Sequence, residues 1–190
     1  MADGTSLQPA EFADALLLRL GADLVGERCP CARCGQELDT RCRHALRCAP
    51  GPSTQGHNRV RDVLLGLASL GDSGSATEVR GLIGSAPQLR PADLLTAAAF
   101  GKVMAFDVGI ANPGSRTAGD DACSSMAERK MSDYAPFLAE LESDGVQYMP
   151  VVWSSWGRAH VDADRAVTSL ARGAARRLGL ANTKGLESRA

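Results

Sequence analysis

Cysteines crowd into one short segment of this chain. Five of the six lie between positions 29 and 48, and His44 lies among them. No secretory signal precedes this segment, because the apolar run at residues 16–18 is short and Arg19 interrupts it. We therefore expect a reducing, intracellular compartment, in which crowded cysteines bind a metal ion rather than form a disulfide framework. We also expect residues 21–56 to be loop-rich and held together by something other than an apolar core.

The spacing of these residues predicts a structural zinc site. Two residues separate the first pair of cysteines, and a turn at Gly35 would let both sulfurs face one ion. The histidine and the last cysteine are four positions apart, so they would share one face of a short helix. Thiolates and imidazole form closed tetrahedral zinc sites, and the predicted ligands are Cys31, Cys34, His44 and Cys48. Cys29 or Cys42 could replace one of them.

The net charge of −1 hides an alternation along the chain. Residues 1–27 carry −4, residues 28–62 carry +4, residues 63–157 carry −5 and residues 158–190 carry +4. Two basic segments therefore enclose an acidic middle, and a basic segment favours nucleic acid as a partner. We expect DNA, with RNA as the alternative, and contacts to backbone phosphates from Arg41, Arg43, Arg47, Arg59 and Arg61.

Hydrophobic periodicity predicts a mixed α/β (α+β) fold. Four helices are expected from apolar residues at helical spacing, over residues 9–20, 58–71, 124–141 and 162–180. Pro136 should kink the third or lie in the first turn of a second helix. Four strands are expected from short apolar runs bounded by turn residues, over 78–83, 89–96, 102–110 and 146–153. The first three strands should form a meander. Because no run approaches the ~20 apolar residues that cross a bilayer, no membrane contact is expected.

The acidic middle contains carboxylates that could converge on a metal ion. Glu78, Asp93 and Asp107 lie in or at the edge of the predicted meander, and Lys130 and Tyr134 share a face of the next helix. Carboxylates on adjacent strands can bind Mg²⁺, which could polarise a phosphodiester while an ammonium stabilises the developing charge. Asp107 is the strongest candidate, because it interrupts an apolar run in which an unpaired charge would be costly.

The order of these motifs is similar to that of a known family. A Cys-Cys-His-Cys knuckle is followed by Arg90-Pro91-Ala92-Asp93, then by Asp107 at the end of an apolar strand, then by Lys130 and Tyr134. This order resembles the C-terminal zinc knuckle and restriction-like endonuclease region of site-specific non-LTR retrotransposon reverse transcriptase proteins, a branch of the PD-(D/E)xK nucleases. The resemblance covers about four-fifths of the chain.

The resemblance implies a fold and roles for individual residues. It implies a PD-(D/E)xK core with the order helix, three-strand meander, helix, strand, helix, preceded by an N-terminal helix and the knuckle. Asp93 and Asp107 would bind catalytic Mg²⁺, Glu78 would be a third acid, Lys130 would be a lysine that has moved from strand to helix, and Tyr134 would support the site. It also implies a nuclear location as an alternative to the cytoplasm.

Two departures from the family pattern affect these roles. Gly109 occupies the position that usually holds the catalytic lysine, so a lysine must come from Lys130 or, alternatively, from Lys102. In addition, Ala92 separates Pro91 from Asp93, where the family has adjacent residues. The domains expected are a helical segment over 1–27, a zinc knuckle over 28–56, a restriction-endonuclease-like domain over 57–182 and a tail over 183–190.

Three functions compete at this stage. The first is a Mg²⁺-dependent DNA endonuclease, derived from a retrotransposon protein, with a structural zinc ion. The second is a non-catalytic, zinc-containing nucleic-acid-binding module, which Gly109 favours. The third is a zinc-stabilised protein-interaction domain anchored by Trp153 and Trp156, although tryptophans in this position more often belong to a core.

Overall fold

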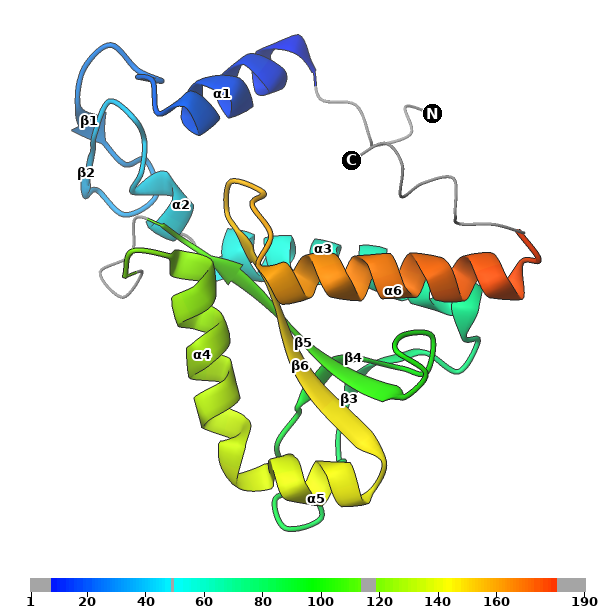
Figure 1. Cartoon of the computed structure of the whole chain (residues 1–190). Helices are drawn as coiled ribbons and strands as arrows, with labels where there is room; N and C mark the ends of the chain where they lie inside the picture. The colour runs from blue at the N-terminus through cyan, green and yellow to red at the C-terminus, as the bar shows by residue number, and fades with distance from the viewer. Residues whose placement is uncertain (1–7, 49, 114–118, 181–190) are drawn as a thin grey trace. The chain divides into compact units, whose positions relative to one another are not determined.

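Two compact units make up the chain, one from Met1 to Thr54 and one from Gln55 to Ala190. The structure is a computed structural model that describes residues 8–48, 50–113 and 119–180, without the side chains of 46, 47 and 50–54 (Figure 1). The predicted tail over 183–190 lies outside the described residues. Within the described part of the chain, no helix combines the length and the apolar character that crossing a membrane requires.

The first unit begins with helix α1, Pro9–Leu20, where the sequence predicted it. Pro9 is tolerated in the first turn because the first amides of a helix have no partner within it. Gly21 ends the helix with a φ of 68°, and its N–H bonds to carbonyls of the last turn. None of the residues of α1 is buried.

The rest of the first unit is small and irregular. Strands β1, Cys29–Pro30, and β2, Glu37–Leu38, pair antiparallel, and helix α2, Ala45–Cys48, follows. The prediction of loop up to residue 56 was wrong at its end, because helix α3 spans Pro50–Gly71. Prolines at residues 50 and 52 fall in its first turn, where a missing N–H costs no hydrogen bond.

The second unit contains the predicted order of elements. After α3 come three strands, a helical stretch, a strand and a helix, which confirms a mixed α/β fold. The strands are β3, Ala76–Val79; β4, Ala92–Thr96; β5, Val103–Ala111; and β6, Val146–Ser154. The helices are α4, Ala122–Tyr134; the 3₁₀ turn η1, Ala135–Phe137; α5, Leu138–Ser143; and α6, Val161–Arg177. Pro136 lies in η1 and therefore separates α4 from α5, as predicted.

The first predicted strand was wrong in its bounds. β3 ends at Val79, and the apolar run that follows turns away from the sheet at Gly81, which has a φ of 73°. Ile83 is nevertheless fully buried, because it packs with Leu141 of α5 and not in a strand. This apolar run therefore predicted burial correctly but strand geometry incorrectly.

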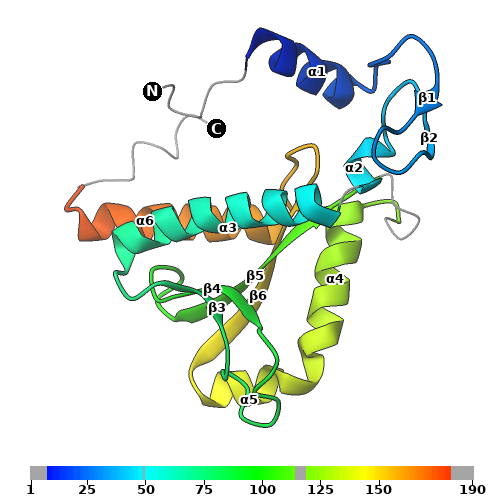
Figure 2. The same ribbon diagram turned by 180° about the vertical axis from the view of Figure 1, so that it is seen from behind.

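The sheet has the order β3-β4-β5-β6. The first three strands are antiparallel neighbours, and β6 runs parallel to β5 along nine residue pairs. A parallel neighbour needs a long crossover, which α4, η1 and α5 provide. Figures 1 and 2 show α4 and α5 on this crossover and show α3 and α6 lying side by side.

Helices cover both faces of the sheet. On one face, Leu64 of α3 and Leu170 of α6 pack with Phe106, Met104 and Val151 of the sheet. On the other face, residues of α4 and α5 pack against β5 and β6 in two smaller clusters. Because side chains alternate along a strand, Asp107 points to the face opposite Phe106, which is the α4 side.

Candidate functional site

The four predicted zinc ligands come together in the first unit. The ligand atoms of Cys31, Cys34, His44 and Cys48 all lie within 4.8 Å of one another. The Sγ atoms of Cys31 and Cys48 are 3.5 Å apart, and Cys34 Sγ lies 3.0 Å from His44 Nε2. Ligands bound tetrahedrally to zinc at ~2.3 Å would be separated by about 3.5–3.8 Å. The cluster could therefore hold a metal ion, and its donor set is compatible with zinc.

Local backbone geometry places these ligands. Cys31 and Cys34 lie in the turn between β1 and β2, which the amide of Gly35 closes with a 2.8 Å bond to the carbonyl of Cys31. Gly35 has a φ of 73°, which favours glycine there. One helical hydrogen bond, from Cys48 N–H to the His44 carbonyl, brings the other two ligands onto one face.

The thiols of the cluster strongly influence one another. Backbone N–H groups of Arg33 and Cys34 lower the pKa of Cys31 to about 6, which favours its thiolate. Hydrogen bonds with the Cys34 and Cys31 sulfurs raise the pKa of Cys48 to about 12. A cation is the natural way to deprotonate all of these sulfurs together.

The two alternative ligands, Cys29 and Cys42, do not belong to this cluster among the described residues. Both are partly buried free thiols. Burial, followed by the nearby Cys29, raises the pKa of Cys42 above its usual value. Cys42 also has a φ of 52°, in the left-handed region, so this residue contributes to a tight turn before His44.

The predicted acids of the second unit lie in a row across the sheet. The register between β3 and β4 aligns position 78 with position 93, and the register between β4 and β5 aligns position 93 with position 107. Paired residues flank this row on both sides between β3 and β4 and on one side between β4 and β5, so Glu78, Asp93 and Asp107 follow one another across three strands. Cross-strand neighbours are close enough for their side chains to interact.

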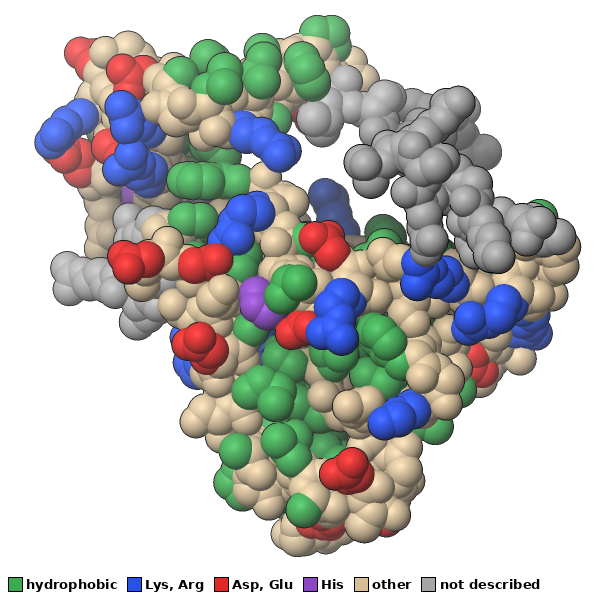
Figure 3. Space-filling view, viewed as in Figure 1, with side chains coloured by type: hydrophobic (Ala, Val, Ile, Leu, Met, Phe, Trp, Pro, Cys, Tyr) green, Lys and Arg blue, Asp and Glu red, His purple; other side chains and the backbone are tan. Residues whose placement is uncertain are grey.

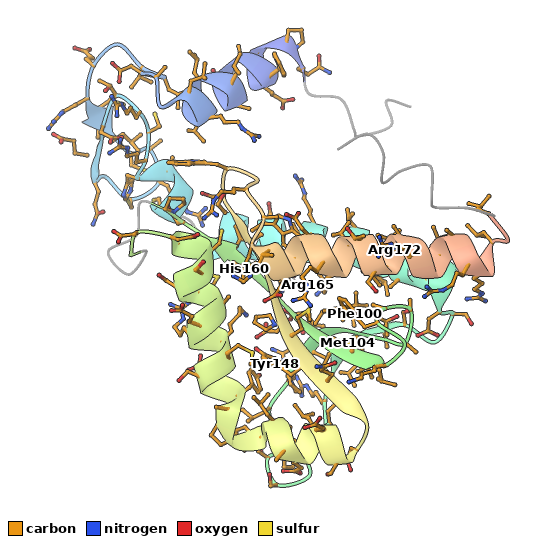
Figure 4. The ribbon with its side chains drawn as sticks, in the orientation of Figure 1. Phe100, Met104, Tyr148, His160, Arg165 and Arg172 are labelled. Atoms are coloured by element: carbon orange, nitrogen blue, oxygen red, sulfur yellow. The ribbon has the colours of Figure 1, made fainter. Side chains whose placement is uncertain are left out.

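Asp107 is the most deeply placed of the three acids. It is 8% exposed, and Lys130 Nζ lies 2.5 Å from its Oδ1 atom. Tyr148 donates a 2.6 Å hydrogen bond to Oδ2, and its hydroxyl also reaches the Lys130 carbonyl at 3.4 Å. Tyr148 lies on β6, on the side of α4 (Figure 4). Burial raises the pKa of Asp107 above its usual value, although the Lys130 ammonium opposes the shift.

Gly109 provides the space that Lys130 occupies. A Cβ atom at position 109 would lie 3.1 Å from Lys130 Cε and 2.8 Å from Met126 Sδ. Lys130 and Met126 are four residues apart on α4, so both reach over the same point of β5. The lysine of the helix therefore fills the volume that a side chain on the strand would otherwise take. Lys102, the alternative lysine, is exposed and precedes β5.

Asp93 has a different environment from Asp107. Its Oδ2 atom accepts a 2.7 Å hydrogen bond from the Val108 amide, and its Oδ1 atom lies 3.4 Å from His57 Nε2. Burial would raise the pKa of Asp93, but the His57 imidazole and the Val108 amide outweigh it, and the pKa is lowered. Hydrogen bonding to Asp93 in turn raises the pKa of His57. The pKa values of these neighbouring acids are therefore shifted in opposite directions, downward for Asp93 and upward for Asp107.

Glu78 is held by two arginines. Arg61 donates a 2.6 Å bond to one carboxylate oxygen and Arg90 a 2.7 Å bond to the other. Tyr134 donates a 3.0 Å bond to the Arg90 carbonyl, and its ring centroid lies 4.8 Å from that of Tyr148. Tyr134 therefore contacts Arg90 and Tyr148, the residues that adjoin Glu78 and Asp107.

The predicted phosphate-binding arginines differ in their surroundings. Arg41 and Arg43 lie within 4.0 Å of Asp23 and Asp39, and Arg59 is exposed. Arg61 is only 16% exposed, because Asp62 and Glu78 bind it. The side chain of Arg47 lies outside the described residues. On the face shown in Figure 3, basic side chains also gather along α6, with exposed arginines at Arg165, Arg172, Arg176 and Arg177.

Sequence reasoning missed two residues of the site, His57 and Tyr148. His57 comes from the first turns of α3 and meets Asp93 only because the helix packs beside the sheet. Tyr148 comes from the parallel strand after the crossover. The one available signal for Tyr148 was a polar aromatic residue in a buried strand, which usually finds a hydrogen-bond partner.

Comparison with models of protein families, with curated proteins and with solved structures found no match to this chain.

Proposed function

We propose that this protein is a metal-dependent DNA endonuclease with a restriction-endonuclease-like core, derived from a non-LTR retrotransposon protein. Asp93 and Asp107 would bind Mg²⁺, and Lys130 would act beside them. The observation that supports this most directly is the meeting of Asp107 and Lys130 above Gly109, since an acid and a lysine from two elements share one partly buried point.

The chemistry is hydrolysis of a phosphodiester. A water molecule loses a proton to solvent as its oxygen bonds to phosphorus, the bond from phosphorus to the 3′ oxygen breaks, and the leaving 3′ oxygen takes a proton from solvent. Carboxylate oxygens are suitable ligands for Mg²⁺, so Asp93 and Asp107 fit such an ion. When bound, the ion would lower the pKa of a ligated water and neutralise charge on the phosphate.

The residues of the chain have separate tasks in this proposal. The Lys130 ammonium stabilises negative charge that develops on the phosphate oxygens. Tyr148 and Tyr134 keep Asp107 and its surroundings in place, since the first donates to Asp107 and the second packs against the first. Glu78 fixes Arg61 and Arg90 next to the acids, where their guanidinium groups can meet a phosphate of the backbone.

A nicking assay on supercoiled plasmid DNA tests this proposal. With Mg²⁺, the wild-type chain should convert supercoiled to open-circular DNA, and Asp107→Asn should be at least about 100-fold slower. Asp133→Asn removes a carboxylate from the exposed face of α4 and is the matched control, which should nick at the wild-type rate. If wild type and Asp107→Asn are equally inert while both bind DNA, the endonuclease proposal fails.

A non-catalytic nucleic-acid-binding module is the second candidate. One observation favours it: both Asp107 oxygens already accept hydrogen bonds, from Lys130 and from Tyr148. In that case the salt bridge would be a structural feature, and binding would come from the basic zinc knuckle. Binding would then fall steeply with salt and would be weaker in Arg43→Ala, whereas no divalent ion would lead to cleavage.

A further inference from the structure

A second group of ligand atoms lies next to the acid and lysine pair. One ligand atom each of His57, Glu78 and Asp93 lies within 4.8 Å of the other two. They come from α3, β3 and β4, so three separate elements bring them together. All three side chains are partly buried, with exposed fractions of 26%, 36% and 17%, which leaves the group open to solvent on one side.

Neighbouring groups orient the two carboxylates of this group. The amide of Val108 binds Asp93 Oδ2, which leaves Oδ1 toward His57 at 3.4 Å. Arg61 and Arg90 bind one oxygen each of Glu78, and every carboxylate oxygen keeps a further lone pair. Ligands held by outer hydrogen bonds in this way are typical of metal sites.

The backbone conformation of Glu78 also supports a binding site at this position. Glu78 has a φ of 55°, in the left-handed region that non-glycine residues rarely adopt. The pairing of β3 with β4 is interrupted at this residue, while the pairs on both sides keep one register. Such a conformation persists only where its surroundings enforce it, and here two arginines hold the carboxylate beside Asp93.

We propose that His57, Glu78 and Asp93 form a binding site for a divalent cation that prefers Mn²⁺ to Mg²⁺. Octahedral ligands at about 2.1–2.2 Å from an ion are about 3.0 Å apart, so the 3.4 Å between His57 and Asp93 needs little adjustment. An imidazole in the donor set disfavours Mg²⁺, which takes oxygen ligands, and favours first-row transition ions. Mn²⁺ combines tolerance of imidazole with the carboxylate ligands present here.

This inference deepens the proposed endonuclease, on which its catalytic meaning rests, because Asp93 belongs to both sets of ligands. The ion would lie between Asp93 and the two arginines that can contact a phosphate. His57 would then be a direct ligand. Asp107 and Lys130 would complete the site from the other side of Asp93.

Electron paramagnetic resonance of Mn²⁺ titrated into the zinc-loaded full chain tests the site without DNA. Wild type should remove about one equivalent of Mn²⁺ from the free signal, and Mg²⁺ should displace it only in large excess. His57→Ala should bind at least about 10-fold more weakly. His160→Asn removes a histidine from the start of α6 but keeps a capping side chain, so it should bind as wild type does.

The outcomes separate this inference from the proposed function. Equal Mn²⁺ binding by wild type and His57→Ala, or equal competition by Mg²⁺ and Mn²⁺, would overturn the site. Nicking that proceeds with Mg²⁺, in a chain whose Mn²⁺ binding does not depend on His57, would sustain the endonuclease and contradict this inference. Mn²⁺ binding that depends on His57 in a chain that never nicks DNA would sustain the site and contradict the endonuclease.

Discussion

The two units of this chain are held together by different means. In the first unit, Cys31 is the only buried residue among those whose side chains are described, and α1 buries none. In the second unit, three apolar clusters fill both faces of a four-stranded sheet. We therefore expect the first unit to depend for its structure on a metal ion bound by its Cys and His side chains, whereas the second depends on apolar burial.

The two units also differ in how their polar side chains are arranged. The ligands of the first unit converge on one point and would saturate an ion, which suits a structural role. The polar groups of the second unit converge from five elements, keep some exposure and include two acids with pKa values shifted in opposite directions, which suits chemistry on a substrate.

Loss of the metal ligands should have the largest expected effect on folding, and this effect should be confined to the first unit. Cys34→Ser removes a ligand from the cluster, so the first unit should lose its fold while the second keeps its cooperative unfolding transition. Zinc content per chain, together with limited proteolysis, measures this. Cys29→Ser is the matched control and should retain about one zinc per chain. A metal-free wild-type chain with a protease-resistant first unit would contradict the expectation that a bound metal ion stabilises this unit.

A core truncation should affect the second unit alone. Leu170 of α6 is fully buried, so Leu170→Ala should lower the free energy of unfolding by about 3 kcal/mol. Leu178→Ala changes a leucine at the end of the same helix that is 55% exposed, and it should cost less than about 0.5 kcal/mol. Urea denaturation followed by circular dichroism gives both values. Zinc content should be unchanged in both variants, and its loss in Leu170→Ala would show that the units are not independent.

Substitution of Gly109 should have a smaller effect on stability and should displace Lys130. The added Cβ of Gly109→Ala meets Met126 and Lys130, so we expect a loss of about 1–3 kcal/mol. Gly66→Ala in α3 meets open space and should stabilise the helix by up to about 1 kcal/mol. Thermal unfolding of the two variants compares them. Equal stability for both would mean that Lys130 does not need the space above Gly109.

The smallest expected effect concerns acid sensitivity of the second unit. Amides of Ala97 and Gly74 lower the pKa of Asp72, so its charged form stabilises the folded state. This contribution is complete above the unfolded pKa of about 3.9 and is lost as the pH falls through the lower folded pKa. Asp72→Asn should therefore cost about 1 kcal/mol at pH 7 and progressively less below about pH 4. Unfolding curves from pH 7 to pH 3 would show whether the difference instead stays constant.

The sequence predicted the fold of the second unit better than it predicted the site. Apolar periodicity identified α6 and the order of strands, because burial of one face is a local signal. It placed the first strand too late, since the buried Ile83 lies outside the sheet. The cysteine cluster was predictable because its ligands are close in sequence, which limits how they can meet.

The missing parts of the site depend on long-range packing. His57 and Tyr148 reach Asp93 and Asp107 from α3 and β6, and no spacing in the sequence reveals these contacts. Gly109 looked like the loss of a lysine, but in the structure it is the gap that Lys130 fills. A lysine on a helix can thus occupy the space beside a strand residue, and no spacing in the sequence shows this.

The nicking rate of Lys130→Met, compared with that of Arg129→Met, tests the central claim most directly. The two substitutions remove adjacent positive charges from α4, but only Lys130 bonds to Asp107, and Arg129 is exposed. At saturating DNA, Lys130→Met should nick at least about 100-fold more slowly than wild type, and Arg129→Met should nick at the wild-type rate. If Lys130→Met nicks as fast as wild type, the pair above Gly109 is structural and the site does not cleave DNA in the way proposed.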